Sequence, residues 1–216
     1  MTTTIEPAVV RLPVNEDFAR PAGRAALERA AEALKAHGMD ARVVEDRHAA
    51  LELLLSLIPA GAQVGQGSSA TLDQIGATAA IEAGDLFESV RVRTRAMDRA
   101  TQGQEIRKHM AAPQVQVNSA QAVTEDGRVV MAAGTGNNIA AVTFGAGSVV
   151  LVVGAQKVVP DLATALRRVD EYAYPLEDVR MQKIYGARAA ANKILILQGE
   201  RPGRVAVILV DEVLGA

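Results

Sequence analysis

Segments with hydrophobic residues at helical spacing alternate along the chain with short apolar segments typical of strands, and this pattern predicts the secondary structure. Residues 21–35 (PAGRAALERAAEALK) place Ala and Leu at helical spacing, with the charges on the opposite face, which predicts an amphipathic helix. Residues 148–154 (SVVLVVG) form a continuous β-branched run that is typical of a strand buried on both faces. By the same criteria we expect helices over 47–57, 70–83, 98–110 and 162–172, buried strands over 193–197 and 205–210, further strands over 41–45, 62–67, 115–124 and 128–133, and a weak strand over 86–92.

Strands that alternate with helices over the whole length predict an α/β fold with a largely parallel sheet and helices on both faces. The turn signal at 125–127 (EDG) also predicts an antiparallel hairpin between residues 115–124 and 128–133. No internal repeat or linker is visible. We therefore expect one domain over residues 21–216, preceded by a loosely held arm over residues 1–20.

Composition narrows the functional classes. The chain has no cysteine, which excludes thiolate nucleophiles and Cys-ligated zinc or iron–sulfur clusters, and its three histidines have no paired spacing, so no metal or other cofactor is expected. Aromatic residues make up 3% and the net charge is −2, which argues against nucleic-acid binding. Apolar runs are far shorter than the roughly 20 residues of a membrane span, and no secretory signal is visible, so the sequence predicts a cytoplasmic protein.

The first candidate for chemistry is the loop GQGSSAT at residues 65–71, between a predicted strand and a predicted helix. Glycines let an anion approach backbone N–H groups, and hydroxyls next to them add donors. The candidate ligand-binding residues here are Gly65, Gly67, Ser68, Ser69 and Thr71. A plain strand-to-helix turn capped by Ser69 accounts for the same letters, so both interpretations stay open.

A second candidate loop has the sequence GTGNN and follows the strand predicted at 128–133. In open α/β sheets, ligands bind outside the carboxyl ends of strands, which is where this loop is expected. Its candidate residues are Gly134, Thr135, Gly136, Asn137 and Asn138, although an ordinary turn would use the same residue types.

Three further positions carry charge or a hydroxyl group. Lys157 follows the predicted central strand and is a candidate clamp for an anion, or else a solvated lysine before a helix. Ser119 precedes the turn that holds Glu125 and Asp126, two adjacent carboxylates that are weak candidates for a catalytic base. A solvated hairpin turn is the alternative for these two.

Several blocks in a fixed order resemble the LUD domain family, the lactate-utilisation proteins of the YkgG/LutC type. They read VGQGSSATL, SAQAVTEDG, GTGN, VGAQKVV, LRR…YP and VDEVLG, and they extend from about residue 22 to the end of the chain. The resemblance implies a fold like that of the NagB/RpiA/CoA-transferase group. It also implies a cytoplasmic component of the system that oxidises L-lactate to pyruvate beside iron–sulfur subunits.

The sequence departs from the family pattern at several positions, namely Gln121, Ala133, Asn138 and Gln156, and residues 185–193 lack the cysteine cluster of longer relatives. These departures put the catalysis that the family implies in question. One hypothesis is therefore an accessory component that binds a small carboxylate or phosphate. The alternative is an enzyme of the isomerase/CoA-transferase/formyltetrahydrofolate cyclo-ligase fold group acting on a phosphorylated or acyl substrate. A regulatory module and a homo-oligomer both stay open.

Overall fold

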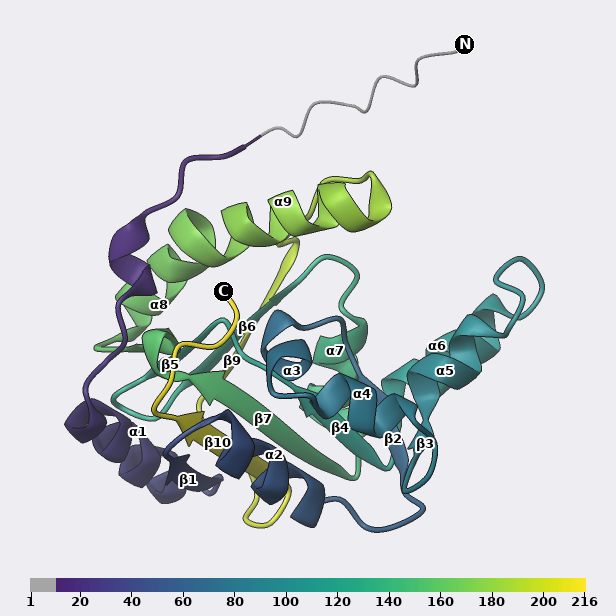
Figure 1. The fold of residues 1–216 in the computed structure, drawn as a ribbon, viewed down its shortest axis with the longest axis horizontal. Coiled ribbons are helices and arrows are strands. Elements are labelled where there is room, and N and C mark those ends of the chain that lie inside the picture. Colours follow the sequence, from purple (N-terminus) through teal and green to yellow (C-terminus); the bar gives the residue numbers. More distant parts are fainter. Residues whose placement is uncertain (1–10) are drawn as a thin grey trace.

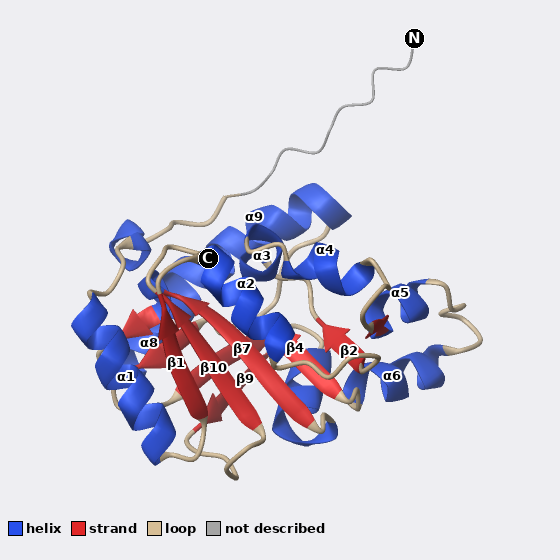
Figure 2. Ribbon diagram, turned by 60° about the horizontal axis from the view of Figure 1, so that its bottom comes forward, coloured by secondary structure: helices blue, strands red, loops and turns tan. Residues whose placement is uncertain are grey.

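A parallel sheet forms the centre of the computed structural model, which describes residues 11–216 (Figures 1 and 2). Its strands are β1 (Asp40–Val44), β2 (Gln63–Gln66), β3 (Glu88–Ser89), β4 (Val115–Asn118), β7 (Ser148–Gly154) and β10 (Val205–Val210). They lie in the order β1-β10-β7-β4-β2-β3, and every neighbouring pair is parallel. The predicted fold class, an α/β protein with a largely parallel sheet, is confirmed.

The strand β7 lies in the interior of this sheet, and its residues explain why the sequence showed no alternation there. Val149, Leu151 and Val153 pack into the hydrophobic cluster on one face, whereas Val150 and Val152 pack into the cluster on the other. Successive side chains of a strand point to opposite faces, so a strand that is covered on both sides needs an unbroken apolar run.

Helices cover both faces of the sheet. On one face lie α2 (Arg47–Ser56), α3 (Ala70–Gln74) and α4 (Ala77–Glu82), whose buried side chains share a cluster with those of β2, β4 and β10. On the other face lies α1 (Arg24–Ala36), which buries Leu27 and Leu34. The predicted amphipathic helix is therefore present, and it begins three residues later than expected because its first turn starts after Gly23.

A second sheet, which the sequence did not predict, lies on the α1 side of the central sheet. It contains β8 (Val158–Val159), β5 (Ala122–Thr124), β6 (Val129–Ala133) and β9 (Lys193–Leu197), in that order. The pairs β5–β6 and β6–β9 are antiparallel, and β5–β8 is parallel. Its outer face packs against α8 (Leu162–Arg168) and the π-helical turn η4 (Val169–Ala173). The predicted strand 193–197 is an edge strand of this sheet and not a buried strand, with Ile194 46% exposed.

The predicted strand over 115–124 is two strands in different sheets. β4 ends at Asn118 in the central sheet, and β5 begins at Ala122 in the second sheet. The hairpin predicted around residues 125–127 is confirmed for β5 and β6 alone. The crossing between the sheets is made by residues 119–121, of which Gln121 already bonds to β6, since its N donates to Val130 O at 3.0 Å.

Three predictions for the segment between β2 and β4 were wrong in part. The helix expected over 70–83 is broken into α3 and α4 at Gly76, whose φ of +82° suits glycine and interrupts the helix. The weak strand expected over 86–92 is short, because Ser89 accepts a hydrogen bond from Val92 N and starts the helix α5 (Val90–Arg95). The helix expected from residue 98 begins later, as α6 (Gly103–Ala111), because the Asp98 side chain caps a separate turn.

The helix predicted over 162–172 continues to residue 185. Its N-cap is Asp161, whose side chain accepts from Thr164 N at 2.7 Å. It runs through α8 and η4 into α9 (Tyr174–Tyr185). Pro175 has no N–H to donate, but the π turn just before it already interrupts the regular hydrogen-bond ladder, so the helix continues past the proline.

The remaining segments are short. The 3₁₀ turn η1 (Glu16–Ala19) lies in the predicted arm, where Asn15 N donates to Glu171 O at 2.8 Å. Residues 1–10 of that arm lie outside the described residues, and its boundary at residue 20 stays a prediction. The helix α7 (Asn137–Ala140) and the π turn η2 (Ala141–Gly145) precede β7, and η3 (Ala155–Lys157) follows it. Within residues 11–216, no helix is long and apolar enough to cross a membrane.

Candidate functional site

A cavity of about 640 Å³ lies between the two sheets and α9. It opens where β2, β4 and β7 end, so it occupies the carboxyl edge of the parallel sheet, and the end of the chain lies beside it, between α9 and β7 (Figures 1 and 2). The loops at the ends of these strands, the residues around α7 and one face of α9 line it. The lining includes residues 67–71, 118–121, 131–135, 137–139, Lys157, Arg99, Glu177, Met181, Tyr185, Arg188, Asn192 and Ala216.

One wall of the cavity is the glycine loop before α3. Gly67 lies so close to the second loop that a Cβ atom there would be 2.3 Å from Asn138 Nδ2, so a larger residue would displace the Asn138 side chain. Ser69 lines the cavity and also accepts from Leu72 N at 3.4 Å as the N-cap of α3. The two sequence interpretations of this loop, cap and cavity wall, therefore both describe its geometry.

The opposite wall contains most of the second glycine loop. Gly134, Thr135, Asn137 and Asn138 line the cavity. Thr135 Oγ1 donates to Asn137 Oδ1 at 2.9 Å, which orders the loop before α7. Two loops that lie far apart in sequence thus line one cavity. The first follows β2 of the parallel sheet, as expected for an open α/β sheet, whereas the second follows β6 of the second sheet, so for that loop the expected position at the edge of the parallel sheet was wrong.

The floor of the cavity contains Lys157, at the end of η3 directly after β7. Its side chain is buried, with 3% exposure, and Nζ donates to Thr71 Oγ1 at 2.9 Å and to Ser119 Oγ at 3.2 Å. No carboxylate of the described residues forms an ion pair with it. The alternative of a solvated lysine is therefore wrong, because this lysine is one of the most buried polar residues of the chain.

Burial, together with the smaller effect of the positive charge of Arg168, lowers the pKa of Lys157 from 10.5 to about 7. Arg168 is itself fully buried, and burial lowers its pKa to about 10. Its Nε donates to Gln156 O at 3.1 Å, and Nη2 has no partner among residues 11–216. Two buried cations thus lie behind the cavity without an acidic partner in the described part of the chain.

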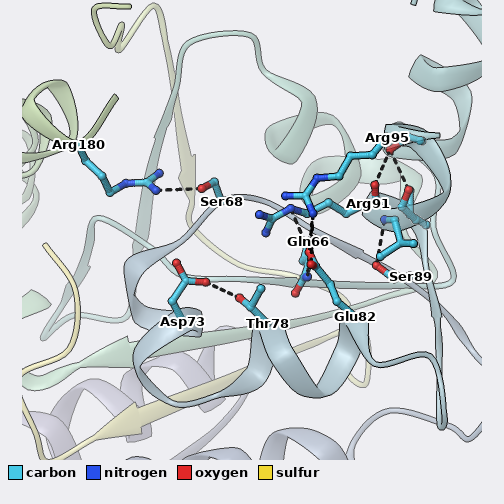
Figure 3. A network of polar contacts seen from close by, with 12 residues as sticks. Gln66, Ser68, Asp73, Thr78, Glu82, Ser89, Arg91, Arg95 and Arg180 are labelled. Atoms are coloured by element: carbon cyan, nitrogen blue, oxygen red, sulfur yellow. Dashed lines mark hydrogen bonds and ion pairs between the residues drawn. The ribbon is translucent and has the colours of Figure 1, made fainter. Parts of the chain in front are cut away.

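The helix α9 contributes residues that the sequence did not indicate. Arg180 Nη1 donates to Ser68 Oγ at 3.0 Å, across the gap between α9 and the glycine loop (Figure 3). The same guanidinium binds Glu177 through Nε at 2.7 Å and Nη2 at 2.8 Å. We had expected the helix to end at residue 172, so the charges after Pro175 were not placed near the site.

Four of the predicted residues do not line the cavity. Gly65 lies inside β2, where a Cβ would contact Pro113, and Gly136, within the second loop, lies against the Lys193 side chain. Glu125 and Asp126 lie on the hairpin turn, where Glu125 Oε2 pairs with Arg29 Nε at 2.7 Å. This pairing matches the alternative interpretation of a hairpin turn for the two carboxylates.

The positions that depart from the family pattern have identifiable contacts. Gln156 Nε2 donates to Leu214 O at 2.9 Å and holds the end of the chain next to the cavity floor. Gln121 Oε1 accepts from a backbone N–H of β6 at 2.8 Å. Ala133 and Asn138 line the cavity, so these two substitutions change the surface that a ligand would meet. Among residues 11–216, no three His, Cys, Asp or Glu side chains come together as a metal site.

Comparisons with known proteins agree with this architecture. The LUD domain family model matches residues 27–210. The crystal structure of a DUF162 family protein from Deinococcus radiodurans is similar in fold, with a TM-score of 0.54 and 13% sequence identity, and the match covers 88% of this chain and 99% of that one. No curated protein matches the chain.

Proposed function

We propose that this chain, which belongs to the LUD domain family, binds a small anionic ligand in the cavity above Lys157. We further propose that it is a YkgG/LutC-type accessory component of the oxidation of L-lactate to pyruvate, with a fold of the NagB/RpiA/CoA-transferase group. The family is associated with lactate utilisation, and the motif order described above supports this subtype. The ligand proposal has independent support in the charges of the cavity.

The observation that carries the proposal is the buried Lys157, which has no acidic partner among residues 11–216. A buried cation without a partner costs stability, and proteins keep such a group mainly where another molecule supplies the opposite charge. A carboxylate or phosphate next to Nζ would form a charge-assisted hydrogen bond worth about 1.5–3 kcal/mol, or roughly ten- to a hundredfold in affinity.

Other polar groups of the cavity suit an anion in the same way. Ser68 offers a hydroxyl group, and Arg99 adds a second positive charge to the lining. Arg180, which does not itself line the cavity, donates a hydrogen bond to Ser68 Oγ and places a positive charge near the mouth of the cavity. Within the described lining, Glu177 is the acidic side chain, and Arg180 neutralises it.

The size of the cavity favours a second candidate function. A volume of about 640 Å³ lies within the roughly 300–1,000 Å³ typical of sites for drug-sized ligands and is generous for a three-carbon acid. This supports the alternative of an enzyme acting on a phosphorylated or acyl substrate. Because Glu125 and Asp126 do not line the cavity, Glu177 would be the carboxylate nearest to such a substrate.

The proposed iron–sulfur partners rest on the family resemblance alone. The chain has no cysteine, so the clusters of such a system would be held by other subunits. We expect the purified protein to contain no stoichiometric iron or sulfide by elemental analysis, and the detection of either would contradict this proposal.

A ligand-stabilisation screen tests the proposed function, because a ligand that binds the native state raises Tm. The panel contains lactate, pyruvate, inorganic phosphate, sugar phosphates, CoA and folates, tested with wild type, Lys157→Met and Lys35→Met. Lys35 is an exposed lysine of α1 that pairs with Glu32, so its replacement is a matched control. We expect at least one anion to raise the Tm of wild type and of the control but not of Lys157→Met. If no anion stabilises wild type, or if all three proteins respond equally, the proposal is wrong.

A further inference from the structure

The hydrogen bonds around Lys157 Nζ reveal its preferred protonation state. Both of its partners already use their own hydroxyl protons elsewhere. Thr71 Oγ1 donates to Leu214 O at 3.2 Å, and Ser119 Oγ donates to Ala120 O at 3.4 Å. A hydroxyl whose proton is engaged can only accept, so each oxygen takes one N–H from Nζ.

Counting donors separates the two states of the amine. An ammonium group has three N–H donors, and the described residues offer two acceptors, so one donor would stay without a protein partner. A neutral amine has two N–H donors and one lone pair, which these two acceptors satisfy completely. In the neutral state the lone pair of Nζ has no hydrogen-bond partner among the described residues. Because Lys157 lines the cavity, this lone pair is available to a ligand there.

The charges around Lys157 favour the same state. Arg168 is the charged group that acts on it, with the same sign, and neither cation forms an ion pair with an acidic side chain of the described residues. With a pKa of about 7, a large fraction of Lys157 is a free amine at neutral pH. An amine that is desolvated and lies next to a second cation is a known arrangement for a nucleophilic lysine.

We propose that Lys157 is a nucleophile that forms an imine with a ligand carrying both a carbonyl and an anionic group, for which a 2-oxo acid is the simplest example. The inference rests on the proposed function, because the cavity must first bind the anion. Arg99 in the lining and Arg180 at the glycine loop are the cations available to hold the carboxylate while the carbonyl faces Nζ.

The step is balanced without an oxidant or reductant. The lone pair of Nζ attacks the carbonyl carbon and forms a C–N bond, and the carbonyl oxygen takes one proton from nitrogen to give a carbinolamine. The second N–H proton then leaves with that hydroxyl group as water, and a C=N bond forms. Thr71 and Ser119 accept both N–H groups and so orient the lone pair of Nζ away from themselves.

Reductive trapping tests the inference. The full-length protein is incubated at neutral pH with pyruvate or glyoxylate and then with sodium borohydride, which adds hydride to the imine carbon and leaves a stable secondary amine. Intact-mass spectrometry counts the adducts, and peptide mapping locates them. Wild type, Lys157→Met and Lys35→Met are compared, with lactate as a ligand that has an anionic group but no carbonyl.

We expect one adduct per chain on Lys157 in wild type and in Lys35→Met, and a loss of at least tenfold in Lys157→Met. Lactate should give no adduct. If the oxo acids raise Tm but leave no adduct on Lys157, the imine is wrong and the anion site stands. If adducts spread equally over the surface lysines, the inference is also wrong. If no anion raises Tm, the proposed function itself fails.

Discussion

Two buried charges lie beside the same cavity, and the fold treats them in opposite ways. Asp178, on α9, is fully buried, and its carboxylate accepts from Arg188 Nε at 2.8–2.9 Å, from Ala189 N at 2.8 Å and from Gln182 Nε2 at 3.0 Å. Lys157, on the floor, is almost as buried but has only two hydroxyl groups as partners. The charged form of Asp178 is satisfied by the protein, and the charged form of Lys157 is not.

This difference separates a structural charge from a functional one. The hydrogen bond from Arg188 lowers the pKa of Asp178, so that the folded state favours the charged carboxylate. Burial lowers the pKa of Lys157, so that the folded state disfavours the charged amine. Asp178 ties the end of α9 to the segment after it, whereas Lys157 weakens the fold and leaves a reactive group at the cavity.

The largest expected effect comes from removing the satisfied charge. Asp178→Asn should lower Tm by roughly 10 °C, because the fully buried carboxylate accepts hydrogen bonds from Arg188, Ala189 N and Gln182, and an amide cannot accept all of them. Differential scanning calorimetry measures it, with the exposed Asp170→Asn as control. A variant as stable as wild type would contradict the structural role of Asp178.

Removing the unsatisfied charge should act in the opposite direction. Lys157→Met keeps most of the side-chain volume and deletes a buried cation, so we expect Tm at pH 7 to rise by about 5 °C. The same scan measures this change. A fall in Tm would mean that the ammonium is stabilised in the fold, and the contrast with Asp178 would be lost.

The stability gap between wild type and Lys157→Met should depend on pH. The unfolded chain keeps its lysine protonated up to a pKa of about 10.4, whereas the folded chain loses that proton near pH 7. Wild type therefore gains stability relative to the variant as pH rises from about 7 to about 10. Urea unfolding across this range should show the gap closing, and a gap that does not change with pH would contradict the lowered pKa.

A smaller effect is expected at the mouth of the cavity. Arg180→Gln removes the contact with Ser68 and one positive charge, and it should weaken anion binding by about two- to fivefold, because this region is partly exposed and screened. Isothermal titration calorimetry measures the affinity, and Tm should change little. If Arg180→Gln loses more anion affinity than Lys157→Met, the main contact with the anion is made by α9 and not by the floor of the cavity.

The sequence predicted the parts of this site that follow from local pattern. The run at 148–154 identified the central strand and so placed Lys157 at the carboxyl edge of the parallel sheet, where the loop after β2 also lies. The second glycine loop reaches the cavity from β6 in the second sheet, which the sequence did not predict. The sequence did not predict α9 as a wall, because Pro175 normally ends a helix and the π turn that accommodates it leaves no recognisable pattern. The sequence also did not predict that the strand over 115–124 breaks after Asn118, because the alternation of apolar and polar residues continues from β4 of the first sheet into β5 of the second.

The charge state of Lys157 also could not be predicted from the sequence. Whether a buried lysine has an acidic partner depends on segments far apart in the chain, as Asp178 and Arg188 illustrate for the opposite case. Only the folded arrangement shows that two hydroxyl groups, one from the glycine loop and one from the crossing at Ser119, are the partners of Nζ.

The titration of Lys157 itself tests the central claim most directly. Lysine labelled with ¹³C at Cε lets NMR follow each amine with pH, and the Lys157→Met spectrum identifies the signal by its absence. We predict a midpoint of about 7 for Lys157 in the free protein, and a midpoint that rises when a bound anion such as lactate supplies the missing charge. A midpoint near 10.5 in the free protein would mean that the amine is solvated or paired, and it would contradict the account.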